Sequence, residues 1–292
     1  MDKWVKMAIS YSHKFGQLIG DLLEVAIEPF LEQFAKNNGL FLDRKGERRT
    51  RKGKKLTWID VKDNKHDLDF VLERGGTDER LGIPVAFIET AWRRYTKHSR
   101  NKAQEIQGAI IPLLEKYSNI SPFAGVILAG EFTQGSLTQL KSQGFSVLYF
   151  SYKSVIQAFK LFGIDAAFDE DTPEEEFKKK LEAIKKIGDI KIIARELMKI
   201  NLDEALSFID GIKKSISRTV INIIIWPLHG ASTSLNSIVE AIKFLKNYSE
   251  DHIKLPFIKY EIIVKYNTGT VINATCSNRL EALDFLERHV GR

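Results

Sequence analysis

The chain has 292 residues, of which 43% are hydrophobic, and a formal net charge of +6. This length and composition support one large domain, or a larger and a smaller one, and exclude a largely disordered chain. The single cysteine, Cys276, excludes a disulfide framework and a Cys/His zinc set. Without a secretory signal pattern or a run of about 18 apolar residues, we expect a soluble cytoplasmic protein that does not contact membranes.

The first third of the chain predicts one helix followed by three strands. Apolar residues recur at helical spacing over 14–36, and "NNG" at 37–39 is a helix stop. The segment "RKGERRTRKGKK" at 44–55 is nearly all basic and predicts a mobile loop. Strand patterns follow at 55–62, 68–74 and 83–92, and we expect these three strands to form an antiparallel meander.

The next segments predict parallel strands joined by helices. A helix is expected over 99–116, and strands over 123–132 and 145–152 have a short helix between them and another after them. Strands that arrive through helical crossovers run parallel, so the predicted sheet is mixed. We therefore predict an α/β fold for residues 1–170, with a mixed central sheet flanked by helices.

The remainder of the chain predicts a connector and a second domain. Residues 171–214 begin with a charged amphipathic helix, for which Thr172 is a possible cap with Glu175 three residues on, and we expect a helical connector. Residues 215–292 have the order strand, helix, strand, strand, helix, which favours a small ferredoxin-like α+β unit. We detect no internal repeat.

Two carboxylates stand out in the predicted meander. Asp69 lies in the strand pattern "LDFVLER", and Glu89 ends the apolar run "PVAFIE". If the two strands pair, these side chains meet at one end of the sheet and offer the oxygen ligands that Mg²⁺ prefers. Asp69 could instead be a solvated turn residue, and Glu89 could form a structural salt bridge to Arg93 or Arg94.

Basic residues cluster beside these carboxylates. In a protein that acts on nucleic acid they would contact phosphates, and the alternative is a solvated loop or a nonspecific polybasic patch. The candidates for nucleic-acid binding are Arg48, Arg49, Arg51, Lys52, Arg93, Arg94, Lys97 and Arg100.

The order helix, three-strand meander with Asp and then Glu, helix, strand resembles the core of the PD-(D/E)XK superfamily of restriction-endonuclease-like nucleases. The resemblance covers roughly residues 12–165 and rests on element order and residue type. It implies that Asp69 and Glu89 are catalytic carboxylates that bind Mg²⁺. It also implies that Glu24, in the opening helix, matches a glutamate that many members place beside the metal.

The lysine of the family signature is missing, because Ala91 stands two residues after Glu89. Arg93 continues the same strand face, and Lys102 lies one turn before Ile106 at the start of an inward helical stripe. We favour Lys102 as the residue that positions or activates water, since arginine has a very high pKa. Alternatively, both residues are surface phosphate contacts, or the site is inactive.

The resemblance implies a metal-dependent endonuclease that hydrolyses DNA, leaves 5′-phosphate ends, and is most similar to type II restriction enzymes. Similar enzymes act as homodimers, and a cognate DNA methyltransferase acting on the same site is a possible partner. Two rival interpretations stay open. One is a catalytically inactive nucleic-acid-binding protein with a nuclease-like fold, and the other is a nuclease for RNA or branched repair intermediates.

Overall fold

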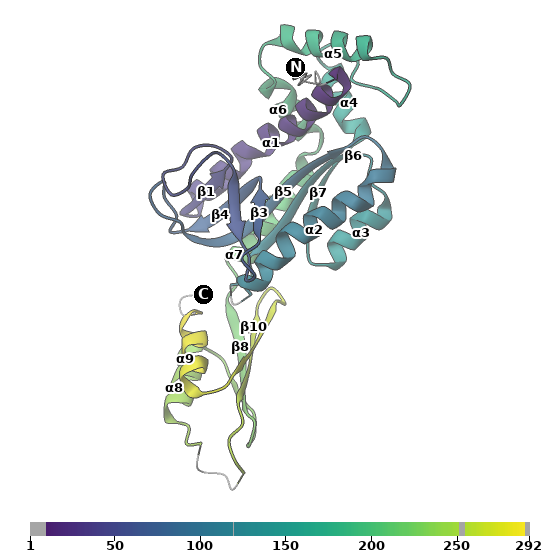
Figure 1. Cartoon of the computed structure of the whole chain (residues 1–292). Helices are drawn as coiled ribbons and strands as arrows, with labels where there is room; N and C mark the ends of the chain where they lie inside the picture. Colours follow the sequence, from purple (N-terminus) through teal and green to yellow (C-terminus); the bar gives the residue numbers. More distant parts are fainter. Residues whose placement is uncertain (1–9, 119, 251–254, 290–292) are drawn as a thin grey trace, which may run out of the picture. The chain divides into compact units, whose positions relative to one another are not determined.

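The computed structural model describes residues 10–118, 120–250 and 255–289, and its chain divides into two compact units (Figure 1). The first unit comprises 123–211 together with the described residues up to Leu113. The second comprises the described residues of 114–122 and those from Ile212 onward. Within the described part of the chain, no helix is both long enough and apolar enough to cross a membrane.

A five-stranded mixed sheet forms the centre of the first unit, which confirms the predicted α/β class. The strand order is β1-β4-β5-β6-β7. The β1–β4 and β4–β5 pairs are antiparallel, whereas β5–β6 and β6–β7 are parallel. The strands are β1 (Leu40–Arg44), β4 (Phe70–Arg74), β5 (Ile83–Arg93), β6 (Phe123–Gly130) and β7 (Ser146–Ser151).

The expected meander is wrong in its first strand. The segment predicted as a strand over 55–62 forms β2 (Leu56–Ile59), which pairs with β3 (Lys65–Leu68) in a separate two-stranded sheet. The edge of the central sheet is β1, a five-residue strand placed directly after the helix stop. Gly39 has a φ of 62°, a left-handed conformation that suits glycine and turns the chain from helix into strand.

Helices cover the sheet as the hydrophobic spacing predicts. The first, α1 (Tyr11–Asn37), packs along β1 and β5. The predicted helix over 99–116 is confirmed as α2 (Ser99–Lys116), whose buried stripe includes Ala103, Ile106 and Ile110. A short 3-10 turn, η1 (Thr96–His98), precedes it. Two shorter helices, α3 (Gln134–Ser142) and α4 (Tyr152–Lys160), pack against β7.

The segment expected as a connector belongs largely to the first unit. Its helices are α5 (Glu174–Ile187), α6 (Lys191–Ile200) and α7 (Leu202–Ile216), and both α5 and α6 pack on α1. The buried side chains of Phe177 and Leu197 explain this docking. The predicted cap is wrong, because Pro173 is the N-cap of α5 and the Thr172 hydroxyl bonds Asp169 instead.

The second unit is an antiparallel sheet with two helices, but its topology is not the expected ferredoxin-like one. The strand order is β11-β10-β8-β9, so β10 lies directly beside β8 and antiparallel to it. A split β-α-β unit would instead leave room for a strand between two parallel partners. The elements are β8 (Val220–Pro227), β9 (Thr233–Leu235), α8 (Ile238–Asn247), β10 (Tyr260–Tyr266), β11 (Val271–Cys276) and α9 (Arg279–Glu287).

This unit contains an internal repeat that the sequence analysis missed. Each half is two antiparallel strands followed by a helix, and "SIVEAIKFL" at 237–245 matches "NRLEALDFL" at 278–286. The helix N-termini also match. Ser237 and Asn278 cap the backbone N–H of Glu240 and Glu281, which in turn accept a hydrogen bond from the residue before the cap.

Candidate active site

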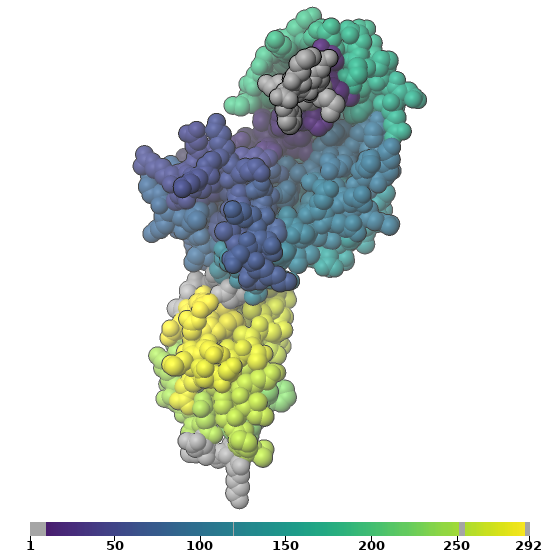
Figure 2. All heavy atoms as spheres, viewed as in Figure 1, coloured from purple at the N-terminus to yellow at the C-terminus, as the bar shows by residue number. Residues whose placement is uncertain are grey.

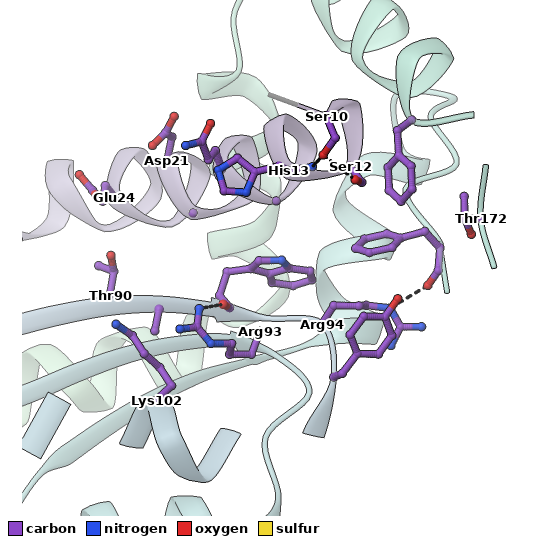
Figure 3. Close-up of a pocket in the computed structure, with 18 of the residues that line it drawn as sticks. Ser10, Ser12, His13, Asp21, Glu24, Thr90, Arg93, Arg94, Lys102 and Thr172 are labelled. Carbon is purple, nitrogen blue, oxygen red and sulfur yellow. Dashed lines mark hydrogen bonds between the residues drawn. The ribbon is translucent and has the colours of Figure 1, made fainter. Parts of the chain in front are cut away.

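A cavity of about 1170 Å³ lies in the first unit between α1 and the C-terminal part of β5. Figure 3 shows Glu24 on the α1 side of this cavity and Thr90 and Lys102 on the opposite side. Asp69, Glu89 and Lys45 also line it. Residues that are far apart in the sequence, from three elements and two connecting segments, therefore face one space.

Strand pairing brings the two predicted carboxylates to this cavity. In the β4–β5 ladder Phe70 lies opposite Ile88, so one residue further along Asp69 lies opposite Glu89. Asp69 itself sits at a bend between β3 and β4. Its Oδ2 accepts hydrogen bonds from the backbone N–H and the hydroxyl of Thr90, at 2.7 and 2.8 Å, which fixes the direction of the carboxylate.

Glu89 is the most unusual group of the site. Glu89 is only 9% exposed, and its Oε1 is buried without a hydrogen-bond partner among the described residues. Burial, reinforced by the negative charge of Asp69, raises the pKa of Glu89 to about 8. A buried carboxyl oxygen without a donor is costly, so this group gains from a proton or a cation.

Lys45 contributes a cation that sequence reasoning did not assign to the site. Its Nζ lies 2.6 Å from Asp69 Oδ1 and 2.7 Å from Glu24 Oε1. Burial lowers the pKa of Lys45, but the hydrogen bonds to Asp69 and Glu24 outweigh it and raise that pKa above its usual range. Burial also raises the pKa of Glu24, with Lys45 opposing the shift. Lys45 is therefore a charged bridge between two acids.

Lys102 lines the same cavity from α2 and faces the Glu89 side. Its Nζ lies 3.1 Å from Glu105 Oε2, and its positive charge opposes the rise in the pKa of Glu89. Arg93 also lines the cavity, but its guanidinium donates to the carbonyl of Trp92 at 2.9 Å. The buried Ala91, at the position of the family lysine, lines the cavity and supplies no charge.

Two of the arginines predicted to contact nucleic acid are bound to acidic side chains inside the protein. The Arg48 side chain is 2% exposed and holds Glu73 through two hydrogen bonds of 2.6 and 2.9 Å, with Asp43 at 2.6 Å. Arg51 binds Asp43 and the carbonyl of Gly46. Hydrogen bonds of these two arginines tie the basic segment 44–55, which is a loop after β1, to acidic side chains of β1 and β4.

Arg49 and Lys52 are exposed, and the basic segment forms part of the surface of the first unit (Figure 2). Neither residue lines the cavity of the carboxylates. Arg49 pairs with Glu79 at 2.8 Å. Both side chains are accessible to a large ligand such as a nucleic acid.

The basic residues after β5 are partly engaged within the protein. Arg94 lines the cavity, stacks over the Tyr152 ring at 3.9 Å and donates to the carbonyl of Phe168 at 2.7 Å. Lys97 forms an ion pair with Glu170. Arg100, in the first turn of α2, is exposed. The positive charges of these three residues therefore lie at the rim of the cavity rather than beside Asp69 and Glu89.

The far part of the cavity is acidic. Asp169, Glu170 and Glu174 line it, and Glu174 accepts hydrogen bonds from the backbone of Tyr11 and Ser12 at the start of α1. A polyanion therefore meets repulsion at this end of the cavity.

The site residues fit a divalent metal ion. No group of three or more His, Cys, Asp or Glu side chains among the described residues is arranged as a metal site. Asp69 and Glu89 are nevertheless two carboxylates, the usual number for Mg²⁺, which retains water and phosphate ligands. The unpartnered oxygen of Glu89 is the observation that fits, because a dication would satisfy it.

Comparisons with known proteins do not assign this chain to a family. No family model and no curated protein matches it. One solved structure is similar, the crystal structure of AF1548, a protein of unknown function. It is 12% identical over 67% of this chain and 98% of that chain, with a TM-score of 0.28.

Proposed function

We propose that the first unit is a metal-dependent nuclease of the PD-(D/E)XK type that hydrolyses DNA phosphodiester bonds, as a type II restriction endonuclease does. The observation that carries the proposal is the buried, unpartnered carboxyl oxygen of Glu89 beside Asp69 in a cavity lined by two lysines. The sheet supports the proposal as well, since β1, β4 and β5 run antiparallel and β6 and β7 follow in parallel.

In this proposal Asp69 and Glu89 hold Mg²⁺, with Glu24 beside it. The bound ion lowers the pKa of a water molecule and neutralises charge that develops on the phosphate. Thr90 orients Asp69 through its two hydrogen bonds. Lys102 orients the attacking water from the Glu89 side, and the rim residues Arg93 and Arg100 attract the phosphate backbone.

A second function is favoured by one specific observation. Ala91 replaces the family lysine, and the ammonium of Lys45 already holds an oxygen of Asp69. A protein that keeps the nuclease fold and binds nucleic acid without cleaving it would show these features. The two functions differ in one measurable result, which is strand cleavage in the presence of a divalent ion.

Cleavage assays on plasmid, linear duplex, single-stranded DNA and RNA with Mg²⁺ or Mn²⁺ test the proposal. We expect the wild type to cut duplex DNA, and Asp69→Asn and Glu89→Gln each to reduce the rate by about 100-fold or more, as loss of a group in the transition state does. Glu182→Gln is the matched control, because Glu182 on α5 is exposed and does not line the cavity.

Three outcomes would change the assignment. Binding of DNA without cleavage under any divalent ion would favour the inactive nucleic-acid-binding protein. Preference for RNA or branched DNA would favour the repair or RNA nuclease. Equal activity of the wild type, Asp69→Asn and Glu89→Gln would remove the active site from this cavity.

A further inference from the structure

The ammonium of Lys45 occupies an oxygen of Asp69 that a divalent ion held by Asp69 would use. It contacts Asp69 Oδ1 at 2.6 Å, while Asp69 Oδ2 is held by Thr90. The oxygen of Asp69 that is not bonded to Thr90 is therefore already bound to a cation. A divalent ion that uses this oxygen has to replace the lysine contact.

We propose that Lys45 and the divalent ion compete for the same carboxylate oxygens, so that the site is loaded by exchange of one cation for another. This inference rests on the proposed metal-dependent function. It assigns Lys45 the role of a tethered counter-ion, which holds the acidic cluster together without metal and sets how tightly metal binds.

Like-charge repulsion explains why the cluster needs a cation at all times. Asp69, Glu89 and Glu24 line one cavity, so their negative charges repel one another there. Without metal, Lys45 is the cation that touches two of them. A dication interacts more strongly with the same oxygens and also reaches Glu89, which Lys45 leaves without a partner.

The surrounding chain permits the lysine to leave without refolding. The Lys45 side chain is 52% exposed, so its amine has a direct route to solvent. Its backbone stays fixed, because Arg51 binds the carbonyls of Arg44 and Gly46 on either side. Only rotations of the long side chain are needed for the exchange.

Metal binding to the full chain tests the exchange directly. We would titrate Mn²⁺ into the wild type, Lys45→Met and Lys54→Met, and measure free Mn²⁺ by electron paramagnetic resonance. Lys54 lies in the same basic segment, is exposed and does not line the cavity. Lys54→Met removes the same positive charge from the chain as Lys45→Met, so it controls for net charge. We expect Lys45→Met to bind Mn²⁺ about tenfold tighter or more, and Lys54→Met to match the wild type.

Thermal unfolding gives a second readout that does not depend on activity. Without metal, Lys45→Met is expected to unfold at a lower temperature than the wild type, and Mn²⁺ is expected to raise its Tm by more. Equal or weaker Mn²⁺ binding by Lys45→Met would overturn the exchange. If the wild type and Lys45→Met bind Mn²⁺ with equal affinity, the exchange is overturned but the proposed metal-dependent function is not. If no variant binds Mn²⁺, both the exchange and the proposed function are overturned.

Discussion

Glu89 dominates the electrostatics of the candidate site at the scale of single residues. Its neighbours supply no hydrogen bond to the buried Oε1, and the nearest positive charges, on Lys102 and Lys45, only partly offset burial and the charge of Asp69. A residue whose only role was structural would be expected to have a donor here. This imbalance is the physical reason to assign a cation to the cavity.

The titration of Glu89 predicts a pH dependence of stability in the metal-free protein. Its folded-state pKa of about 8 lies above the ordinary value of 4.5, so the folded protein binds the proton more tightly than the unfolded chain. The free energy of unfolding therefore falls as pH rises from about 4.5 to 8, by up to about 1.4 kcal/mol per pH unit, and levels off outside that window.

Glu89→Gln removes this dependence, because the amide resembles the protonated acid. Urea unfolding in the presence of a chelator should show the variant more stable than the wild type at pH 8.5 and close to it at pH 4.5. Parallel stability curves for the two proteins across this range would contradict the assignment of the raised pKa to Glu89.

At the scale of elements, the segment from β1 to β2 positions the cationic side of the cavity. Arg48 lies between Glu73 on β4 and Asp43 on β1, and all three side chains are buried. The segment is thereby tied to two neighbouring strands of the central sheet. Lys45 projects from the stretch between β1 and this arginine.

Removal of Arg48 should destabilise the first unit strongly. Arg48→Met leaves the buried carboxylate of Glu73 without its arginine and removes one of the two arginines bound to Asp43, which costs about 3–5 kcal/mol of unfolding free energy. Arg49→Met is the matched control. Its side chain is 79% exposed, and the change is expected within about 0.5 kcal/mol of the wild type. Chemical denaturation measures the free energy of unfolding of each variant, and equal effects of the two substitutions would refute the buried network.

The missed elements have local physical explanations. Periodicity identified α1 and α2 because their buried stripes run over several turns. It does not predict β1, which has five residues and follows the helix stop directly, so the pattern does not place Lys45, the residue after β1, beside the central sheet. Arg48 is buried between Asp43 of β1 and Glu73 of β4, and composition does not show such a pairing.

At the scale of the whole molecule, the chain consists of two units that each have their own core. The sequence predicts a separate C-terminal domain from residue 215, and the second unit combines the described residues from Ile212 onward with those of 114–122. Its internal symmetry escaped detection because the helices match in sequence while the hairpins differ in length. The core of this unit includes Ile223, Ile262 and Leu286.

Separate cores predict separate unfolding transitions in calorimetry. Asn278→Ala removes the cap of α9 and should lower the stability of the second unit by about 1 kcal/mol. Ser277→Ala is the neighbouring control, since its backbone N–H still bonds Glu281. We expect Asn278→Ala to shift one transition and Arg48→Met the other, and a single transition shifted by both variants would contradict two independent units.

The proposed nuclease activity depends on joint binding of one divalent ion by Asp69 and Glu89. A crystal of the wild-type protein soaked in Mn²⁺, with anomalous diffraction recorded near the manganese edge, measures this most directly. We expect an anomalous peak in contact with one oxygen of Asp69 and one oxygen of Glu89. We also expect the Lys45 amine to be turned away from Asp69. A map with no peak at these carboxylates, and with Lys45 still bonded to Asp69 at saturating Mn²⁺, would contradict it.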